Sequence, residues 1–327
     1  MNCLVLGANG FIGQHIVNEL LCRRRSVKIF IRKDNAMFKD KNIEIVFGDL
    51  LDMNSLISAM KGVDIVFHSA AYVSDWGPKS LFLKINVDGT KNVLDACLYN
   101  NIRRLIYIST YAIFDFRSGG LISEKSKKIL KPYPYCYSKF LAERLIWKYR
   151  EKYRIPVTVV YPPWVYGPGD QHFFPGIVKA LKTGKAFYFS KNGNNYIELC
   201  YVANLAEAIV NLSEDDDTIG EGYVVSDGTR VTFRQLVEKI ADITNLAKPR
   251  LSFPYPVSYI IAFFLEAFYK IFHVQHRPIV TMYVVELLGK SLLCDNSKLK
   301  QLGFRPKISF EEGFNNAIAD LRLRKIF

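Results

Sequence analysis

The sequence predicts an α/β fold built on a doubly wound parallel sheet, with a smaller, mostly helical lobe towards the C-terminus. Two observations support this class. The apolar run Cys3-Leu-Val-Leu passes through a glycine turn directly into an amphipathic segment, residues 14–21, so a strand and a helix are joined by a tight turn. Strand-like and helix-like segments then alternate as far as residue 161, which is typical of parallel sheets with helical crossovers.

Apolar runs, helical periodicity and the glycines and prolines between them define the individual elements. The alternation weakens after residue 170, which predicts a domain boundary there. We expect residues 1–170 to form the sheet domain, with return segments near 197–226, and residues 171–196 and 227–327 to form the smaller lobe. The expected strands are residues 3–7, 27–31, 43–47, 64–68, 105–109, 157–161 and 222–226, and the expected helices are residues 14–21, 56–61, 81–100, 135–153, 176–181, 202–212 and 233–245.

The turn after the first strand has the spacing G-x-x-G-x-x-G at Gly7, Gly10 and Gly13. Glycine allows a sharp turn at the first position, a close approach of backbone to a pyrophosphate at the second, and close packing of helix on sheet at the third. The helix that follows would then direct its N-terminus at the anion. This pattern predicts a phosphate-binding turn, and the alternative is an ordinary glycine-rich turn between a buried strand and a helix.

Composition and charge exclude several classes of protein. The chain has 327 residues, 50% of them hydrophobic, which is ample for a large core. Its six cysteines form no C-x-x-C pair and no cluster with histidine, so we expect free thiols, a reducing compartment and no metal site. The first strand begins almost at Met1, which leaves no room for a secretory signal and indicates a cytoplasmic address.

The formal net charge of +13 does not indicate a nucleic-acid partner, because the basic residues are spread along the chain without a recognition motif. The densest basic group, between Arg23 and Lys33, lies beside the proposed phosphate turn, and a nucleotide would explain part of it.

Candidate catalytic side chains follow the fifth strand. Tyr135 and Lys139 are four residues apart and share one face of the expected helix, where an ammonium group can favour the phenolate form and lower the cost of proton transfer. Ser109 and Thr110 end the strand at the carboxyl edge of the sheet, where open α/β folds bind ligands, and a hydroxyl there can hold a substrate carbonyl. The alternative is that both hydroxyls only satisfy loop backbone groups.

These motifs and several others occur in an order that resembles the extended short-chain dehydrogenase/reductases of the NAD-dependent epimerase/dehydratase superfamily. Within that group the sequence is similar to the 3β-hydroxysteroid dehydrogenase branch, which includes sterol dehydrogenases and 2-alkyl-3-oxo acid reductases. The general motifs are the glycine turn, Gly48-Asp49-Leu50, His68-Ser69-Ala70-Ala71, Asn86-Val-Asp-Gly-Thr90, Ser109-Thr110, Tyr135-x-x-x-Lys139 and Pro162-x-x-x-Tyr166-Gly-Pro-Gly-Asp170; those of the branch are Asp75-Trp-Gly-Pro78, Leu302-Gly-Phe-Arg-Pro306 and Phe310-Glu-Glu-Gly313.

The resemblance implies a Rossmann domain and an NAD(P)-dependent oxidoreductase that interconverts a ketone and a secondary alcohol on a hydrophobic substrate, 3-oxoacyl or sterol-like. Tyr135 would exchange the proton, Lys139 would bind the cofactor ribose and control the tyrosine, and Thr110 would position the substrate oxygen. The chain departs from the family pattern at Phe114-Asp115, and at Tyr161, where relatives commonly carry arginine. The implied cofactor-binding residues are Gly7, Gly10, Phe11, Ile12, Gly13, Arg32, Asp49, Leu50, Ser69, Ala70, Ala71, Tyr135, Lys139, Pro162 and Val165.

Charge at the end of the second strand favours NADP over NAD. An NAD enzyme places a carboxylate there to bind the ribose hydroxyls, and that carboxylate would repel a 2′-phosphate. This chain has Arg32 and Lys33, of which arginine matches phosphate geometry better. NAD is the alternative cofactor, because Asp34 could bind the ribose hydroxyls and because Arg32 and Lys33 could both be solvated surface cations.

Two other functions use the same motifs: a nucleotide-sugar epimerase or reductase, and a redox sensor that binds NADP without turnover. The apolar stretch 253–274 bears on the substrate, and it has two interpretations. It is either a helix buried in the smaller lobe, with Glu266 and Lys270 paired at its surface, or a helix that gates a pocket for a lipid-like substrate and touches a membrane surface. The sequence leaves open whether the protein forms a homodimer.

Overall fold

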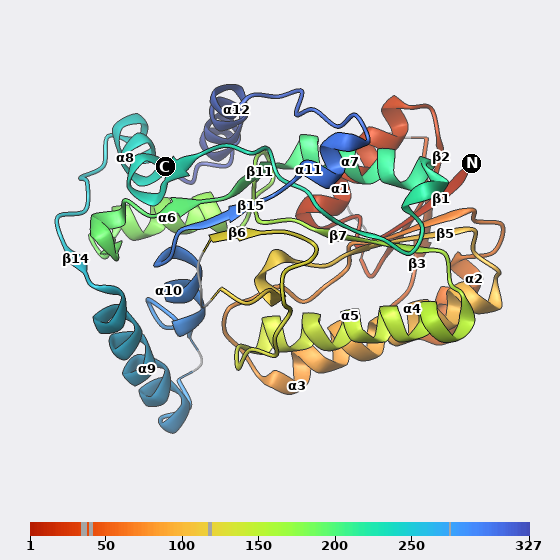
Figure 1. The fold of residues 1–327 in the computed structure, drawn as a ribbon, viewed down its shortest axis with the longest axis horizontal. Helices are drawn as coiled ribbons and strands as arrows, with labels where there is room; N and C mark the ends of the chain where they lie inside the picture. The colour runs from red at the N-terminus through yellow and green to blue at the C-terminus, as the bar shows by residue number, and fades with distance from the viewer. Residues whose placement is uncertain (34–37, 39–41, 117–119, 275) are drawn as a thin grey trace.

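A computed structural model describes residues 1–33, 38, 42–116, 120–274 and 276–327 of the chain (Figure 1). Its central element is a seven-stranded sheet with the order β12-β7-β5-β4-β1-β2-β3, and every neighbouring pair is parallel. The strands are β1 (Asn2–Leu6), β2 (Ser26–Ile31), β3 (Glu44–Phe47), β4 (Ile65–His68), β5 (Arg104–Ile108), β7 (Val157–Tyr161) and β12 (Gly222–Val224).

Helices cover both faces of the sheet, which confirms the predicted doubly wound fold. One face carries α1 (Phe11–Cys22) and α7 (Val202–Glu214), and the other carries α2 (Met53–Ala59), α4 (Gly89–Tyr99) and α5 (Pro134–Tyr153), as Figure 1 shows. A separate apolar core fills the space between sheet and helices on each face. The central strands are mainly apolar because both of their faces are buried, and they also contain the buried polar residues His68, Arg104 and Thr158.

The strand order places a crevice at the carboxyl ends of β1 and β4. The chain leaves β1 towards β2 on one side and returns to β4 on the other, so the connections after these two strands diverge. Ligands of open α/β sheets bind at such a topological switch point. The segments that follow β1, β4 and β5 are therefore the ones expected to line a site.

The helix expected at residues 81–100 is interrupted by a π-helical segment, Leu83–Asp88, between α3 (Lys79–Phe82) and α4. Asn86 within this segment is buried. Its Oδ1 accepts from the backbone amide of Tyr72, and its Nδ2 donates to the Tyr72 carbonyl and to the Ser138 hydroxyl. The wider turn thus lets one side chain join the loop after β4 to α5. Such π-bulges are frequent near functional sites.

The second lobe packs around an aromatic core beyond the carboxyl edge of the sheet. Short strands connect it to the sheet domain; β8 (Trp164–Tyr166), which follows β7, pairs with β11 (Leu199–Tyr201) in parallel. Stacked rings such as Tyr166 on Phe174, with centroids 5.3 Å apart, stabilise the junction. The main helices of this lobe are α6 (Phe173–Lys182), α8 (Phe233–Thr244), α9 (Tyr255–Ile271), α10 (Met282–Leu288) and α12 (Phe310–Leu323).

One part of the region assigned to the smaller lobe packs on the sheet domain instead. Leu299, in α11 (Ser297–Gln301), and Phe304 are buried in the core that contains α1 and α7. The division of the chain at residue 227 therefore stays an interpretation. All six cysteines are unpaired thiols.

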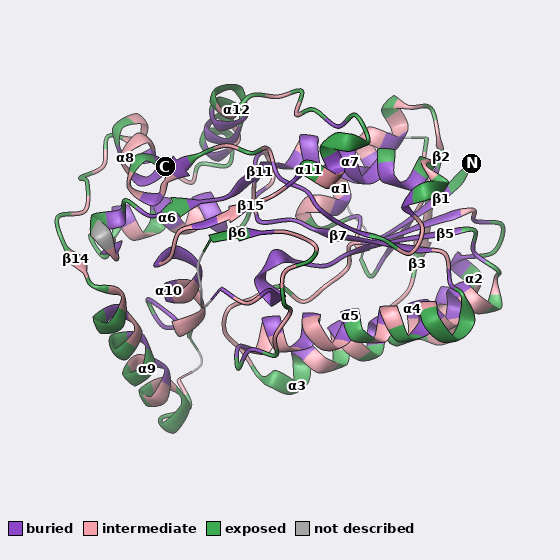
Figure 2. Ribbon diagram, in the orientation of Figure 1, coloured by how far each residue is buried: buried purple, intermediate pink, exposed green. Residues whose placement is uncertain are grey.

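The interpretation of residues 253–274 as a helix buried in the lobe is wrong for most of its side chains. Figure 2 shows α9 projecting from the body with most of its surface exposed. The buried residues of α9 are Ser258, Ala262 and Glu266. Glu266 is 7% exposed, and its carboxylate caps α10 by accepting from the Met282 amide at 2.7 Å. The expected pair with Lys270 does form, at 3.3 Å, but Glu266 is not at the surface. In the part of the chain that the structure describes, no helix is long and apolar enough to cross a membrane.

Candidate active site

The glycine turn after β1 leaves the N-terminus of α1 open to a ligand. Gly7 has φ of +85°, and a Cβ there would lie 2.7 Å from the backbone of Ala70. A Cβ on Gly13 would collide with the carbonyl of Gly7, so α1 can lie this close to β1 only with glycine. The N-cap residue is Gly10, which has no side chain to satisfy the first amides of the helix. The turn therefore presents backbone donors to an anion, as a dinucleotide diphosphate requires.

A cleft of about 770 Å³ is lined by this turn and by the carboxyl ends of β2, β3 and β4. Its walls contain eight of the predicted cofactor residues: Gly7, Gly10, Arg32, Asp49, Leu50, Ser69, Ala70 and Ala71. Three further lining residues belong to features named above: Asn9 to the glycine turn, Lys33 to the basic pair and Gly48 to the Gly48-Asp49-Leu50 motif. The structure also adds lining residues that the motifs did not indicate: Phe30, Ile31, Leu51, Leu81, Lys84 and Ile85.

The remaining predicted cofactor residues lie beside this cleft or away from it. Phe11 and Ile12 start α1, directly behind the turn. Pro162 and Val165 instead follow β7, the third strand from β1 in the sheet, and the Pro162 carbonyl accepts from the Tyr111 amide at 3.1 Å. The structure therefore does not bring Pro162 and Val165 to the walls of the cleft, and their cofactor role stays a prediction.

The charge of the cleft is mainly positive. Among the described residues that line it, Arg32, Lys33 and Lys84 are cations and Asp49 is the one acid. The Asp49 carboxylate accepts a hydrogen bond from the Leu51 amide at 2.9 Å, so one of its oxygens already has a partner in the same loop. Arg32 and Lys33 are exposed at the end of β2, and Asp34 lies outside the described residues.

The basic group beside the turn divides into two parts. Arg32 and Lys33 line the cleft, whereas Arg23 and Arg25 bond the carboxylate of Glu214 at 3.0 and 2.6 Å. A nucleotide therefore has no part in explaining Arg23 and Arg25, which join α1 to α7.

Tyr135 and Thr110 meet at the end of β5. Tyr135 is in the first turn of α5, and Thr110 caps the 3₁₀ turn that follows β5, where its Oγ1 accepts from the Ala112 amide at 3.2 Å. The Thr110 hydroxyl lies beside the Tyr135 phenol. Burial raises the pKa of Tyr135 above its ordinary value, and the hydrogen-bonding effect of Thr110 opposes that rise. The hydroxyl of Ser109 instead donates to Glu143 at 2.7 Å, which leaves Thr110 as the strand-end hydroxyl beside the tyrosine.

Lys139 lies one turn further along α5 and is anchored to β5. Its ammonium donates to the Tyr107 hydroxyl and to the Ile108 carbonyl, both at 2.8 Å. Burial lowers the pKa of Lys139 to about 7, against the opposing effect of the Glu143 charge. A lysine poised near neutral pH can change its charge within the working range of an enzyme.

Glu143, one turn beyond Lys139 on α5, accepts hydrogen bonds from four donors. The carboxylate, 3% exposed, accepts from Ser109 Oγ and Lys128 Nζ, both at 2.7 Å. It also accepts from the Tyr161 hydroxyl at 2.8 Å and from Trp147 Nε1 at 3.1 Å. Tyr161, the departure from the family pattern, thus serves as a partner of a buried carboxylate. These four donors, one of which is the cation Lys128, keep the buried charge of Glu143 satisfied.

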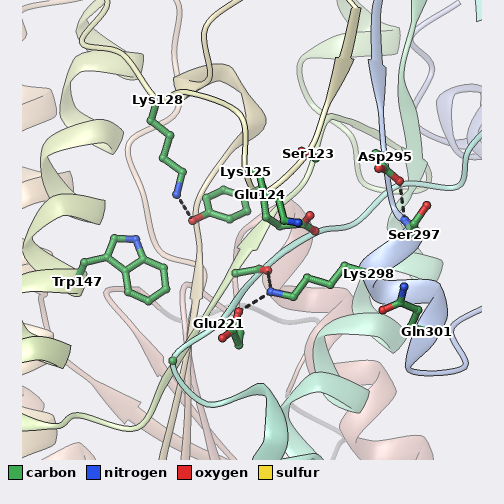
Figure 3. Close-up of a pocket in the computed structure, with 13 residues that line it drawn as sticks. Ser123, Glu124, Lys125, Lys128, Trp147, Glu221, Asp295, Ser297, Lys298 and Gln301 are labelled. Atoms are coloured by element: carbon green, nitrogen blue, oxygen red, sulfur yellow. Dashed lines mark hydrogen bonds and ion pairs between the residues drawn. The ribbon is translucent and has the colours of Figure 1, made fainter.

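Lys128 connects Glu143 to a solvent-filled cleft of about 660 Å³ at the β7–β12 edge of the sheet (Figure 3). Several charged groups of this cleft already have partners: Lys298 pairs with Glu221 at 2.6 Å, and Asp295 accepts from the Ser297 amide at 2.9 Å. Tyr135 does not line it. The cleft therefore gives the buried network access to water but contains none of the candidate reacting groups.

A different cavity, of about 490 Å³, reaches Tyr135. Its wall is mainly apolar and comes from both lobes: Trp164, Phe173, Phe187, Val280 and Leu288 are among the lining side chains. Such a cavity can enclose an apolar ligand and present one end of it to the phenol.

Charged side chains also line this cavity. Lys179, Lys185 and Arg277 contribute cations, and Asp75 contributes the one carboxylate among the described lining residues. The Asp75 carboxylate already bonds Arg277 at 2.6 Å and the Thr281 hydroxyl at 3.0 Å. The two lysines thus make the cavity attractive to an anionic group.

The model of the NAD dependent epimerase/dehydratase family matches residues 3–226. The chain belongs to this family. Two relatives of this epimerase/dehydratase protein match over almost its whole length. The sterol-4-alpha-carboxylate 3-dehydrogenase, decarboxylating, of Mus musculus is 28% identical, over 99% of this chain and 92% of the relative. The 2-alkyl-3-oxoalkanoate reductase of Shewanella oneidensis is 27% identical, over 98% of this chain and 86% of the relative.

A solved structure confirms the fold of this family member. The crystal structure of gox2253 superposes with a TM-score of 0.83 at 25% identity and covers 100% of this chain and 99% of the other. The predicted resemblance to NAD(P)-dependent dehydrogenases and reductases is thereby confirmed at the level of family and fold. The roles of individual site residues stay predictions, which the geometry above now makes specific.

Replacing Glu143 with glutamine should move the pH profile of NAD(P)H-dependent turnover. The change keeps the shape of the side chain but removes the negative charge that raises the pKa of Lys139. The ammonium form of Lys139 should then be lost at lower pH than in the wild type, so the limb of kcat that falls with rising pH should shift towards acid.

The measurement is kcat against pH for the wild type, Glu143→Gln and the control Glu221→Gln. The control removes an equal charge from the solvent-filled cleft of Figure 3 and should leave the limb in place. A Glu143→Gln profile that is lower in height but unshifted would show that Glu143 has only a packing role.

Proposed function

We propose that this protein is an NADP-preferring oxidoreductase that interconverts a ketone and a secondary alcohol on a hydrophobic, carboxylate-bearing substrate. The observation that carries the proposal is the position of Tyr135, which lies beside the Thr110 hydroxyl and also lines a largely apolar cavity. The two strands that end at this point, β4 and β5, are neighbours, so the cofactor cleft and the cavity share one edge of the sheet.

The residues divide the proton chemistry among them. In the reducing direction Tyr135 gives its phenolic proton to the carbonyl oxygen, and in the oxidising direction the phenolate takes the hydroxyl proton. The Thr110 hydroxyl holds the same oxygen, and the Lys139 ammonium stabilises the phenolate from within α5. NADP(H), when bound, supplies or accepts the hydride that completes the two-electron change.

A carboxylate on the substrate is supported by the charge of the cavity. Lys179 and Lys185 are exposed at its wall, and no acid except the engaged Asp75 lines it within the described part of the chain. The names of both relatives combine a carboxylate or alkanoate with an oxygen function at carbon 3. A substrate with an apolar body and a carboxylate near the reacting carbonyl would satisfy both the aromatic wall and the cations.

The preference for NADP is supported by the three cations of the cofactor cleft. Arg32 and Lys33 stand at the end of β2, where the ribose of the adenosine half is bound in this fold, and both are exposed. Their charge would favour a 2′-phosphate over a free hydroxyl.

The other functions fit the geometry less well. A nucleotide-sugar epimerase or reductase needs polar partners for hydroxyl groups, whereas aromatic and aliphatic side chains dominate this cavity. A redox sensor without turnover would have no need of Tyr135 beside Thr110 and above a buried Lys139. The cytoplasmic address and the homodimer stay predictions of the sequence.

Replacing Arg32 with alanine should weaken NADPH binding selectively. A charge-assisted bond to phosphate contributes about 1.5 to 3 kcal/mol, so the Kd for NADPH should rise roughly 10- to 100-fold while that for NADH barely changes. The measurement is cofactor titration by fluorescence, with Arg24→Ala, an exposed arginine before β2, as the control. An equal loss for both cofactors would show that Arg32 does not bind the 2′-phosphate.

Purified protein should oxidise NADPH with long-chain 3-oxo acids in preference to nucleotide sugars. Each methylene buried in the cavity contributes about 0.8 kcal/mol, so kcat/KM should climb roughly fourfold per carbon over several carbons. Methyl esters of the same acids are the matched control, because they keep the apolar body and lose the charge; they should react less efficiently. Equal rates for acid and ester would remove the carboxylate from the proposal, and faster turnover of nucleotide sugars would overturn it.

A further inference from the structure

We propose that α9 docks on the surface of an anionic lipid bilayer and holds the cavity at Tyr135 beside the membrane; the inference rests on the proposed hydrophobic substrate. The starting observation is an exposed apolar surface. Its most exposed members are Phe264 at 66% and Ile271 at 70%. The apolar face of α9 comprises Val257, Ile260, Ile261, Phe263, Phe264, Phe268 and Ile271, and Phe272 extends it.

A narrow stripe attaches the helix to the lobe. Ser258, Ala262 and Glu266 are its buried residues, spaced by four so that they share one side of the helix. Glu266 secures this side, since its carboxylate bonds the first amide of α10. Tyr255, Tyr259 and Leu265, beside this stripe, also pack on the core of the lobe. The exposed apolar face lies on the other side of the helix, and Figure 2 shows α9 standing clear of the body. An apolar face of this extent on a helix too short to span a bilayer is suited to lying in the interface plane.

Charge identifies the kind of surface. Residues 251–290 contain two carboxylates, Glu266 and Glu286, and both are largely buried and bonded to neighbouring groups. The same stretch presents Lys270 and Arg277 to solvent, together with two histidines. Lys270 and Arg277 pair with Glu266 and Asp75, but the side chains of these cations are 64% and 51% exposed, against 9% and 13% for the carboxylates. The charge presented to solvent is therefore positive, which is complementary to anionic headgroups.

A bilayer explains this surface better than a second copy of the chain. A two-fold interface over α9 would cover the exposed Lys270 and Arg277 of both copies, and residues 251–290 offer no exposed carboxylate from the second copy to pair with them. The position of the cavity points the same way. Arg277, Ile279 and Val280, which follow α9, line the cavity that reaches Tyr135. Docking of α9 would thus place the wall of the cavity next to the lipid bilayer, in which an apolar substrate dissolves.

The test is co-sedimentation of full-length protein with vesicles, using phosphatidylglycerol mixed with phosphatidylcholine against phosphatidylcholine alone. The wild type should bind the anionic vesicles, and added salt should weaken that binding. In the double variant Phe263→Asp, Phe264→Asp, the fraction of protein bound to anionic vesicles should fall about tenfold or more, because two carboxylates then lie on the docking face. The matched control is Leu323→Asp, which alters an equally exposed apolar residue on α12 and should bind like the wild type.

Two further measurements separate the possible outcomes. NADPH affinity and kcat/KM for a short, water-soluble 3-oxo acid should be unchanged in the double variant, which shows that it is folded. Light scattering after size exclusion gives the oligomeric state. The proposal is overturned if the wild type ignores anionic vesicles, or if it is a dimer that the double variant converts to monomers without any vesicle binding. Vesicle binding with no turnover of any ketone would leave the docking surface in place and contradict the proposed function instead.

Discussion

The attachment of α5 to β5 is the constraint on which the site depends. Tyr135, Lys139 and Glu143 occur at intervals of four, so the helix presents all three to the sheet. The bonds of Lys139 to Tyr107 and to the Ile108 carbonyl fix the helix against the end of the strand. The phenol is thereby held at the carboxyl edge by two regular elements rather than by a loop, which is how a site keeps its geometry. The buried charges that accompany this arrangement are stable because each has its partners.

The topology of the sheet explains why a cofactor cleft and a substrate cavity share that edge. Parallel strands bring their carboxyl ends together, so the glycine turn after β1, Ser69 after β4 and Thr110 after β5 follow neighbouring strands. The second lobe then supplies the apolar wall opposite Tyr135. The polar cleft is thus formed by the sheet domain and the apolar one largely by the added lobe. A division of this kind allows one cofactor site to serve many substrates.

Much of this could be predicted from the sequence, because the decisive features are local. Strand and helix positions follow from short-range periodicity, and the glycine turn and the Tyr135–Lys139 spacing lie within single segments. Contacts between distant segments could not be predicted. Leu81, Lys84 and Ile85 reach the cofactor cleft only through the packing of a helix whose π-helical segment leaves no obvious pattern. The role of Glu143 as a shared hydrogen-bond acceptor depends on Ser109 at a strand end and on Lys128 in a distant loop, so it cannot be recognised from the sequence around Glu143. The exposure of α9 was left undecided by the sequence, because an apolar stretch is compatible with a buried helix and with an interfacial one.

The account rests on Tyr135 as the proton donor, and the most direct measurement is the kinetics of Tyr135→Phe with NADPH and a long-chain 3-oxo acid. The variant loses one hydroxyl and almost no volume, so NADPH affinity should be kept. A general acid contributes about 10²- to 10⁴-fold, and kcat should fall by that factor. A variant that keeps more than about a tenth of wild-type turnover, with the chemical step limiting, would contradict the account, because another group would then be supplying the proton.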